Sequence, residues 1–285
     1  MNEKVLERPS KSVMETNLST TYYLSFSDIP HAKAVSTILG AKEWYLKHRR
    51  EVGKATIPFM EARYKAIDAL IKKTGITQVI EFAAGRSVRG INNPQWNFIH
   101  SDYDSHALRE MKRAVHRMGM KNTNLHFIQF DVITRRGMNK VMRSLNNAKV
   151  AVIHSGLTTY YPHATKEKIA HTVQFLLKKY GGVYITPDIP TLEYDKKLLQ
   201  ITPDHDQREK TRSTFIGRDL KSFKFKTYKE IHTFYSSLGF KIVRYKIGDL
   251  VSTISSIKRL YKNSAEGKKI EDIVKNREIW LMTVP

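Results

Sequence analysis

The 285-residue chain contains no cysteine, so disulfide bonds, thiolate-bound metal sites and cysteine nucleophiles are all excluded. It also lacks an uninterrupted apolar run of about 18 residues, the length that a membrane-spanning helix requires. Residues 1–21 are polar and have no apolar centre of the kind found in a secretory signal. Together these absences predict a cytoplasmic protein with no membrane partner.

Acidic residues are scarce, with 27 Asp and Glu against 49 Lys and Arg, which gives a formal net charge of +22. One interpretation is a surface that binds nucleic acid or another polyanion. The other is a solvated, lysine-rich surface, because the basic residues are spread along the chain and most are interleaved with Glu or Asp. No basic tail and no appended RNA-binding module is visible, so a nucleic-acid partner is possible but not favoured.

The chain is long and apolar enough to fold around a core, with 41% hydrophobic and 10% aromatic residues. Residues 1–30 are predicted to be a flexible N-terminal arm, and residues 31–285 a single domain. Helical periodicity in residues 31–75, including a helix that opens at Pro58, predicts an N-terminal helical cap. Residues 190–225 contain Pro190 and Pro203 among many charges and read as an insertion over the site.

Between and after these segments, short β-branched runs alternate with helical patterns, which is typical of βαβ units and a mainly parallel sheet. A helix followed by two strands at the end of the chain suits an antiparallel strand at one edge. The predicted fold is therefore α/β and Rossmann-like. The predicted strands are Thr77–Phe82, Trp96–Ser101, Leu125–Phe130, Val150–His154, Val183–Thr186, Lys241–Tyr245 and Arg277–Val284, and the helices after the cap are a segment from Ser105, Thr165–Tyr180 and Thr227–Leu238.

Three successive strands end in residues that suit a nucleoside ligand. In open α/β sheets, ligands bind beyond the carboxyl ends of the strands. The first strand runs into a small-residue turn, Glu81 to Gly90, in which Ala83 and Gly85 let a ligand approach the backbone. Asp102, with Asp104 as the competing candidate, ends the second strand where an acid hydrogen-bonds ribose hydroxyls. Asp131 ends the third. Each alone also fits an ordinary strand end, but together they favour an adenosyl group.

Arg63 gives an independent clue from the helix that opens at Pro58. It lies on the same helical stripe as Phe59 and Ile67, and a guanidinium on a buried face needs an anionic partner. That partner is either a nearby acid (Glu61, Asp68 or Glu81) or the carboxylate of a ligand. An adenosyl group at one end and a carboxylate at the other describe S-adenosylmethionine.

The segment Gln78–Gly90 (QVIEFAAGRSVRG), with Glu61-Ala62-Arg63 upstream, resembles the leucine carboxyl methyltransferase family and its bacterial polyketide O-methyltransferase-like relatives. Further similar segments are FIHSD (98–102), FIQFDV (127–132), GLTTYY (156–161) and ITPD (185–188). The resemblance implies a class I methyltransferase fold and S-adenosylmethionine as cofactor. It places Arg63 on the methionine carboxylate, Gly85 beside the cofactor, Asp102 on ribose and Asp131 near adenine.

The chain departs from this family at Ser155, where a Glu usually precedes the GL pair, and His154 stands before it. The departure puts in doubt how the methionine amino group is held. The complete set of expected cofactor-binding residues is Arg63, Glu81, Ala83, Gly85, Asp102, Tyr103, Asp131, Val132, His154 and Ser155.

The expected reaction is O-methylation of a small molecule or of a peptide or protein carboxyl group. A carboxylate acceptor needs no base, whereas a phenol or alcohol benefits from one. His154, Tyr160 and Tyr161 are the candidates to face the methyl group, and the sequence does not single out a general base. No metal site is expected. The alternatives are a nucleic-acid-directed methyltransferase and a non-catalytic protein that binds S-adenosylmethionine.

Overall fold

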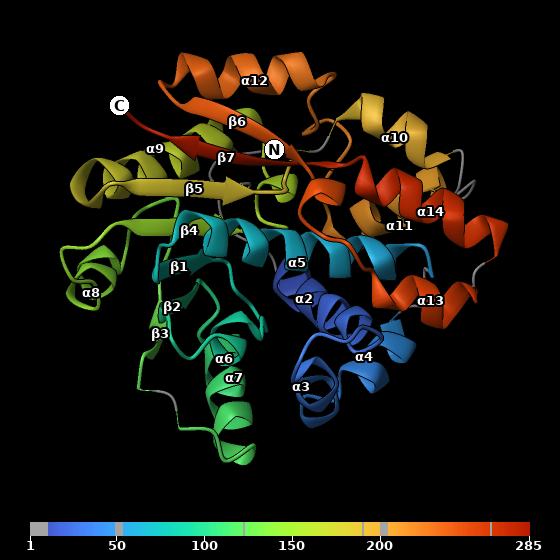
Figure 1. Cartoon of the computed structure of the whole chain (residues 1–285), viewed down its shortest axis with the longest axis horizontal. Coiled ribbons are helices and arrows are strands. Elements are labelled where there is room, and N and C mark those ends of the chain that lie inside the picture. Colours follow the sequence, from blue (N-terminus) through green and yellow to red (C-terminus); the bar gives the residue numbers. More distant parts are fainter. Residues whose placement is uncertain (1–10, 49–53, 122, 190, 200–204, 263) are drawn as a thin grey trace.

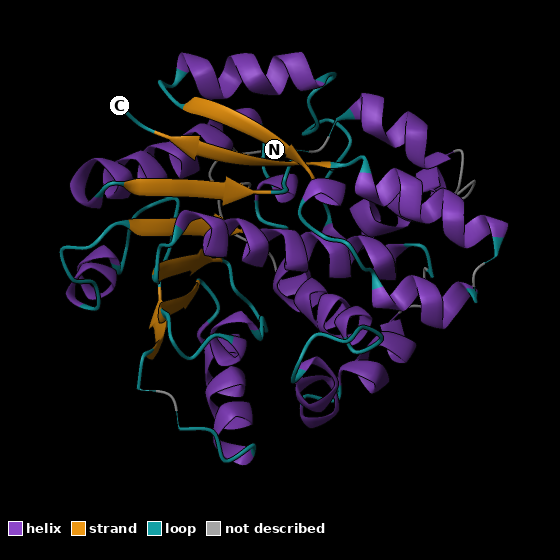
Figure 2. Ribbon diagram, viewed as in Figure 1, coloured by secondary structure: helices purple, strands orange, loops and turns teal. Residues whose placement is uncertain are grey.

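The computed structural model describes residues 11–48, 54–121, 123–189, 191–199, 205–262 and 264–285. A seven-stranded sheet forms their centre, in the order β3-β2-β1-β4-β5-β7-β6, with helices on both faces (Figures 1 and 2). The strands are β1 Gln78–Phe82, β2 Asn97–Asp102, β3 Leu125–Gln129, β4 Val150–His154, β5 Gly182–Thr186, β6 Lys241–Lys246 and β7 Glu278–Thr283.

The sheet is parallel from β3 through β5, and its strand order reverses between β1 and β4. Strands β1 and β4 are buried along their whole length, as expected for central strands covered on both faces. The antiparallel strand β7 lies between β5 and the edge strand β6. The predicted α/β fold, with an antiparallel pairing near one edge, is confirmed.

Each face of the sheet has its own apolar core. One core joins the sheet to α5 (Thr56–Thr74), α13 (Ser255–Tyr261) and α14 (Ala265–Lys275). On the other face lie α8 (Met138–Arg143), α9 (His163–Tyr180) and α12 (Tyr228–Ser237). A smaller cluster packs α5 against α6 (Arg89–Asn92) and α7 (Ser105–Arg117). The carboxyl ends of the parallel strands, which we call the strand-tip region, are therefore held by packed helices on both faces of the sheet.

The N-terminal segment is more ordered than predicted. Residues expected to form a flexible arm instead contain helix α2 (Lys11–Leu24), which packs on α5 and on α3 (Ala32–Ile38) and α4 (Ala41–His48). Its Leu18 and Tyr22 are buried in a cluster with Tyr45. Their four-residue spacing places both side chains on one helix face. The arm prediction is wrong for residues 11–30, while residues 1–10 lie outside the described residues.

The segment predicted as an insertion contains α10 (Leu192–Leu199) and α11 (His205–Ile216). The Lys224 ammonium lies 2.6 Å from the Asp195 carboxylate and 2.8 Å from that of Glu209, which ties the loop after α11 to both helices. Residues 190 and 200–204 of the prediction lie outside the described part. Within it, no helix combines the length and apolar character needed to cross a bilayer.

Candidate functional site

The loop after β1 is tied to the end of β2 by one carboxylate. The Gly85 N–H donates to Asp102 Oδ2 at 2.7 Å, and the Asp104 N–H donates to Asp102 Oδ1 at 2.8 Å. Burial raises the pKa of Asp102 to about 6, although these two N–H groups oppose the shift. Asp102 therefore fixes the loop and still has acceptor capacity, because each carboxylate oxygen accepts more than one hydrogen bond.

Ala83 adopts a left-handed backbone conformation (φ 49°) and is exposed. That region is strained for a residue with a Cβ atom. The turn is held by its neighbours, since the Ala84 N–H donates to the Ser101 carbonyl at 2.9 Å and the Ser101 hydroxyl donates to the Glu81 carbonyl at 2.8 Å. The small-residue turn predicted from the sequence is thus built into the sheet.

Helix α2 covers this loop. A Cβ atom added at Gly85, where φ is +52°, would lie 2.7 Å from the Asn17 side-chain nitrogen. Arg86 donates to the Asn17 side-chain oxygen and to Glu110 of α7. Asn17 therefore occupies the space beside Gly85 in which a ligand was predicted to lie. The position of Asn17 was not predicted, because residues 1–30 were expected to be flexible.

Glu81 and Arg89 form a buried pair beneath the loop. Arg89 Nε lies 3.3 Å from Glu81 Oε1, and Arg89 also donates to the Tyr64 carbonyl at 3.1 Å and to Asp68. The second oxygen, Glu81 Oε2, is buried with no hydrogen-bond partner among the described residues. Burial raises the pKa of Glu81 to about 8. Arg89 thus pairs with Glu81 and Asp68, two of the three acids predicted as partners for Arg63, and the third, Glu61, pairs with Lys65.

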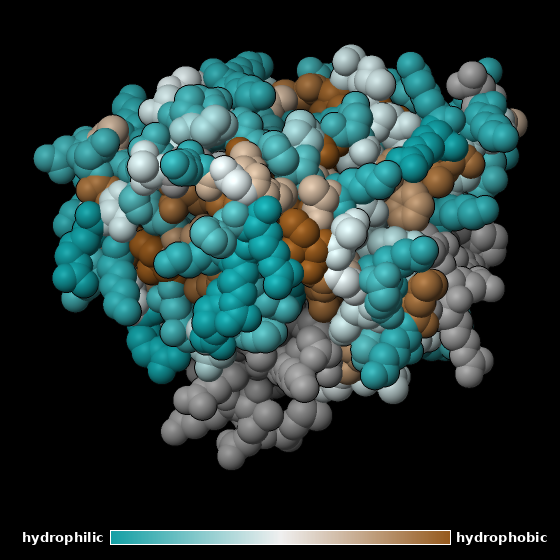
Figure 3. Space-filling model, turned by 90° about the horizontal axis from the view of Figure 1, so that it is seen from below, coloured by the Kyte–Doolittle hydropathy of each residue, from teal (hydrophilic) through white to brown (hydrophobic). Residues whose placement is uncertain are grey.

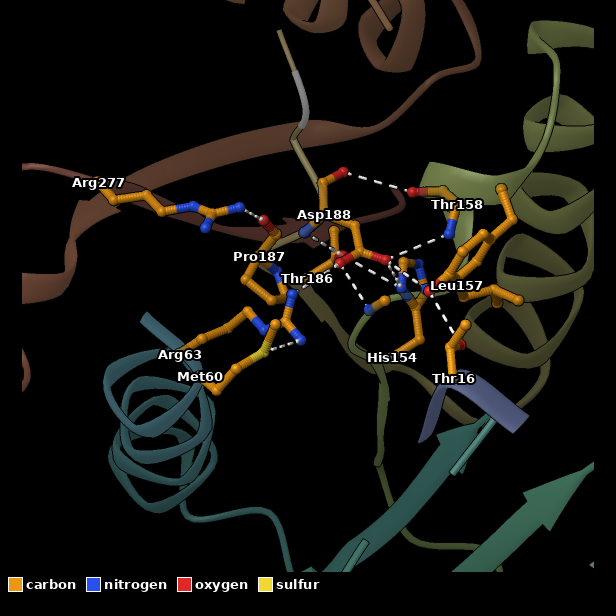
Figure 4. Close-up of polar contacts among 12 residues, drawn as sticks. Thr16, Met60, Arg63, His154, Leu157, Thr158, Thr186, Pro187, Asp188 and Arg277 are labelled. Atoms are coloured by element: carbon orange, nitrogen blue, oxygen red, sulfur yellow. Dashed lines mark hydrogen bonds and ion pairs between the residues drawn. The ribbon is translucent and has the colours of Figure 1, made fainter. Parts of the chain in front are cut away.

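Arg63 points instead toward the ends of β4 and β5 (Figure 4). Its guanidinium lies 3.8 Å from Asp188 Oδ1, and a second nitrogen lies 3.1 Å from the Met60 sulfur. Burial lowers the pKa of Arg63 to about 10, opposed by Asp188 and reinforced by the nearby Arg277 and Arg212. The long contact to Asp188 leaves donors of Arg63 available to an anionic ligand.

Asp188, two residues after β5, accepts most of the hydrogen bonds that connect the ends of β4 and β5. It accepts hydrogen bonds from the N–H groups of Gly156 and Leu157, both at 2.7 Å, and of Thr158 at 3.2 Å. Burial alone would raise the pKa of Asp188, but the hydrogen bond from His154, the charge of Arg63 and these N–H groups hold it well below its ordinary value. The ITPD segment was noticed in the sequence, but its Asp was not assigned a role.

His154 does not face the position predicted for the methyl group. The ring is fully buried, with Nδ1 3.2 Å from Asp188 Oδ2 and Nε2 hydrogen-bonded to the Tyr184 hydroxyl. Both ring nitrogens are engaged inside the protein, so His154 does not face an acceptor and does not serve as a base there. Its neighbour Ser155 is half-buried at the strand end.

At the end of β3, the Asp131 side chain is hydrogen-bonded within its own loop. The Asp131 carboxylate accepts from the Ile133 N–H at 2.9 Å and from the Thr134 hydroxyl at 2.7 Å. Its expected contact with adenine would have to compete with these bonds. Val132 is buried beside it, and Tyr103 is half-buried with the Arg136 guanidinium 5.9 Å from its ring centre.

Two tyrosines follow β4, each beneath an arginine from the insertion. Arg212 lies 5.1 Å from the ring centre of Tyr160, and Arg218 lies 5.2 Å from that of Tyr161. The Tyr160 hydroxyl is 3.1 Å from Thr16 Oγ1 of α2. Although burial opposes it, the charge of Arg212 lowers the pKa of Tyr160, whereas burial raises that of Tyr161. The pKa values of the two tyrosines are therefore shifted in opposite directions.

Among the described residues, no group of three or more His, Asp or Glu side chains is arranged to hold a metal ion. Asp104, the competing candidate for the ribose contact, caps α7 instead, accepting from the His106 N–H at 2.8 Å. Helix α7 therefore begins at Ser105 with Asp104, rather than Ser105, as its N-cap, which leaves Asp102 as the acid at the loop.

No family model matches the sequence, and no curated protein matches it. Solved structures with a similar fold include a protein described as a putative methyltransferase from Thermobifida fusca YX, with 12% identity, 98% of this chain and 96% of that chain covered and a TM-score of 0.56. A DUF574 family protein from Streptomyces avermitilis MA-4680 has 14% identity, 98% coverage of both chains and a TM-score of 0.52.

The methyltransferase domain of bacterial CtHen1 has 11% identity, covers 79% of this chain and 98% of its own, and has a TM-score of 0.50. At these identities the likeness concerns the fold alone. It confirms the class I methyltransferase fold that the sequence predicted.

Proposed function

We propose that the protein is an S-adenosylmethionine-dependent O-methyltransferase whose acceptor is a small molecule or a carboxyl group. The observation that carries the proposal is the placement of two opposite charges along the strand tips. A buried acid, Asp102, is fixed to the loop after β1, and a buried cation, Arg63, lies over the ends of β4 and β5. S-adenosylmethionine carries ribose hydroxyls on its adenosyl part and a carboxylate on its amino-acid part, which this pair complements.

The residues present fit the cofactor. Asp102 has the capacity to accept from ribose hydroxyls, and Arg63 offers donors to the methionine carboxylate. The unpartnered oxygen Glu81 Oε2 becomes a buried acceptor when the carboxyl ionises, and a cationic amino group beside it would favour that ionisation. That arrangement supplies a substitute for the carboxylate absent at Ser155.

When bound, S-adenosylmethionine supplies a methyl group on a positively charged sulfur, which an acceptor oxygen attacks in line. The protein's task is to align the two partners and exclude water. Helix α2 from one side and α11 from the other reach Tyr160 through Thr16 and Arg212, and so they cover the strand-tip region at the end of β4.

The charges around Tyr160 favour an anionic acceptor. Arg63 and Arg212 both act on this tyrosine, while Asp188 is already engaged by His154 and three backbone N–H groups. A carboxylate in this position is ionised near neutral pH and needs no base. For a hydroxyl acceptor, Tyr160 replaces His154 as the group to test.

The direct test is calorimetric titration with S-adenosylhomocysteine combined with transfer of a labelled methyl group to carboxylate and phenol acceptors. We expect binding by the wild-type chain and a tenfold or greater loss in Asp102→Ala, with Asp272→Ala on the exposed face of α14 as the matched control. Equal affinity in Asp102→Ala and wild type contradicts the proposed site. Binding without transfer to any acceptor favours a non-catalytic cofactor-binding protein.

A further inference from the structure

Helix α7 carries a stripe of basic side chains that the proposed reaction does not use. The exposed residues Arg109, Lys112, Arg113, His116 and Arg117 recur at intervals of three and four positions, so they lie on one helix face. We call these five residues the basic stripe. With a rise of about 1.5 Å per residue it extends over roughly 12 Å. The opposite face of α7 is apolar and packs on β2 and β3.

No acid on α7 offsets this charge. The only acidic residue in the helix, Glu110, faces Arg86 and His106 rather than the stripe. Among the residues that the structure describes, no carboxylate pairs with Lys112, Arg113 or Arg117, and Arg109 donates only to the Ser105 hydroxyl at 3.1 Å.

The stripe costs the helix stability. Arg109, Arg113 and Arg117 form successive like-charge pairs four residues apart, each destabilising an isolated helix by about 0.2–0.5 kcal/mol. Helix α14 shows the opposite pattern, with exposed Lys268 and Lys269 among acids and an ion pair of 2.7 Å between Glu271 and Lys275. The charge on α7 is therefore a local feature and not an average of the basic composition.

The basic surface continues past the start of α7. Arg136, exposed on the loop after β3, lies over the ring of Tyr103, two residues before the helix. Gln129 of the edge strand β3 donates to the Tyr103 carbonyl at 3.1 Å, which fixes the two segments to each other. In Figure 3, which views the molecule from the side of β3 and α7, hydrophilic side chains dominate much of this face.

We infer that the basic stripe and Arg136 form a binding surface for the phosphate backbone of a nucleic acid. Guanidinium groups predominate among these side chains, and they bind phosphate oxygens in a bidentate manner. The half-buried Tyr103 adds an aromatic ring beside the cations. A membrane is a poorer fit, because the exposed large apolar side chains among the described residues are Leu46, Phe175 and Val243, none of them on α7.

This inference does not depend on methyl transfer. The helix that carries the stripe begins at Ser105, three residues after Asp102. The phosphate backbone is common to RNA and DNA, so the experiment uses both. Loss of nucleic-acid binding would leave the proposed cofactor site intact, and loss of cofactor binding would leave this surface intact.

The test is fluorescence anisotropy of labelled 20-nucleotide single strands of RNA and of DNA, titrated with the full chain at several salt concentrations including 150 mM. The stripe variant carries Arg109→Glu, Arg113→Glu and Arg117→Glu. The control variant carries Lys258→Glu, Lys268→Glu and Lys269→Glu on α13 and α14, which changes the net charge equally. Thermal unfolding of both variants shows whether each remains folded, and Arg113→Gln provides a milder single variant.

We expect the stripe variant to bind at least tenfold more weakly than the control, with Arg113→Gln weakened about two- to fivefold. Because each phosphate contact with a single strand contributes about −0.7 to the slope of log affinity against log salt, the slope should become shallower by about 2. Equal losses in the stripe and control variants would show that net charge alone drives binding and would overturn the inference. So would absence of binding at 150 mM salt, or binding to vesicles containing phosphatidylserine in place of the oligonucleotides.

Discussion

The two halves of the strand-tip region differ in how their polar groups are satisfied. At the ends of β4 and β5, Asp188 gathers three backbone N–H groups and His154 in a closed network. At the ends of β1 and β2, Asp102 holds the Gly85 loop, Glu81 retains an unpartnered oxygen and Ala83 is strained and exposed. The first half is therefore a closed scaffold that presents Arg63, and the second half is where a ligand completes the structure.

The largest effect is expected from breaking the scaffold half. Asp188→Ala leaves buried N–H groups and His154 without their acceptor, so we expect a loss of about 3–5 kcal/mol in the free energy of unfolding. Asp188→Asn retains one acceptor oxygen and should lose less. Urea unfolding followed by circular dichroism measures both. A loss below about 1 kcal/mol in Asp188→Ala would show that this network is not a scaffold.

Arg63 extends from α5 over the β4–β5 half. Arg63→Ala should weaken binding of S-adenosylhomocysteine by about 1–3 kcal/mol, because a charge-assisted hydrogen bond to the ligand carboxylate is lost. The effect on the free energy of unfolding should be smaller than that of Asp188→Ala, since the ion pair with Asp188 is long. Calorimetric titration checks the affinity, with Lys72→Ala on the exposed part of the same helix as control. Unchanged affinity in Arg63→Ala would show that Arg63 does not bind the ligand.

The ligand side should also respond to pH. The pKa of Asp102 is raised from 3.8 to about 6, so the folded protein is protonated there at pH 5 and ionised at pH 7. Ribose hydroxyls donate more strongly to the carboxylate, and affinity for S-adenosylhomocysteine should therefore rise as pH increases from 5 to 7. As pH rises from 3.8 to about 6, the free energy of unfolding should fall. The reason is that, in this range, the folded state still binds a proton at Asp102 that the unfolded state has lost.

Titrations between pH 5 and 7 test this prediction in the wild type and in Asp102→Asn, which cannot ionise. The variant should bind more weakly at pH 7 and lose the rise. A rise of equal size in Asp102→Asn would assign the pH dependence to another group.

The smallest effect concerns the cover over the loop. Asn17 lies where a ligand would approach Gly85, so cofactor binding requires this side chain to shift. Asn17→Ala removes that cost, and affinity for S-adenosylhomocysteine should rise by about two- to fivefold, as expected when a binding-competent arrangement becomes more populated. The neighbouring Thr20→Ala, half-buried on the same helix, is the control. Weaker binding in Asn17→Ala would mean that Asn17 contacts the ligand.

The fold was predictable because its signals are local and repeated. Short buried strands such as Gln78–Phe82 and Val150–His154 and a long helix ending at Gly75 follow directly from apolar periodicity and turn residues. Helix α2 was missed because its apolar residues show little helical periodicity, and the Leu18–Tyr22 pair becomes meaningful only against Tyr45 of another helix.

The site was predictable only in part. Residue type and strand-end position identified Asp102 and Arg63, but the partners of a buried charge depend on tertiary structure. Arg89, from a short helix, takes Glu81 and Asp68, which frees Arg63 to face Asp188. His154 stands at a strand end, yet its ring packs inward against Tyr184, which strand position alone does not specify.

The central claim is that one ligand bridges Asp102 and Arg63 across the strand tips. The most direct measurement is a crystal structure of the chain with S-adenosylhomocysteine. We predict the ribose hydroxyls on Asp102, the amino-acid carboxylate on Arg63 and the amino group toward Glu81. Density for the ligand elsewhere, with Asn17 still seated against Gly85, would contradict the account.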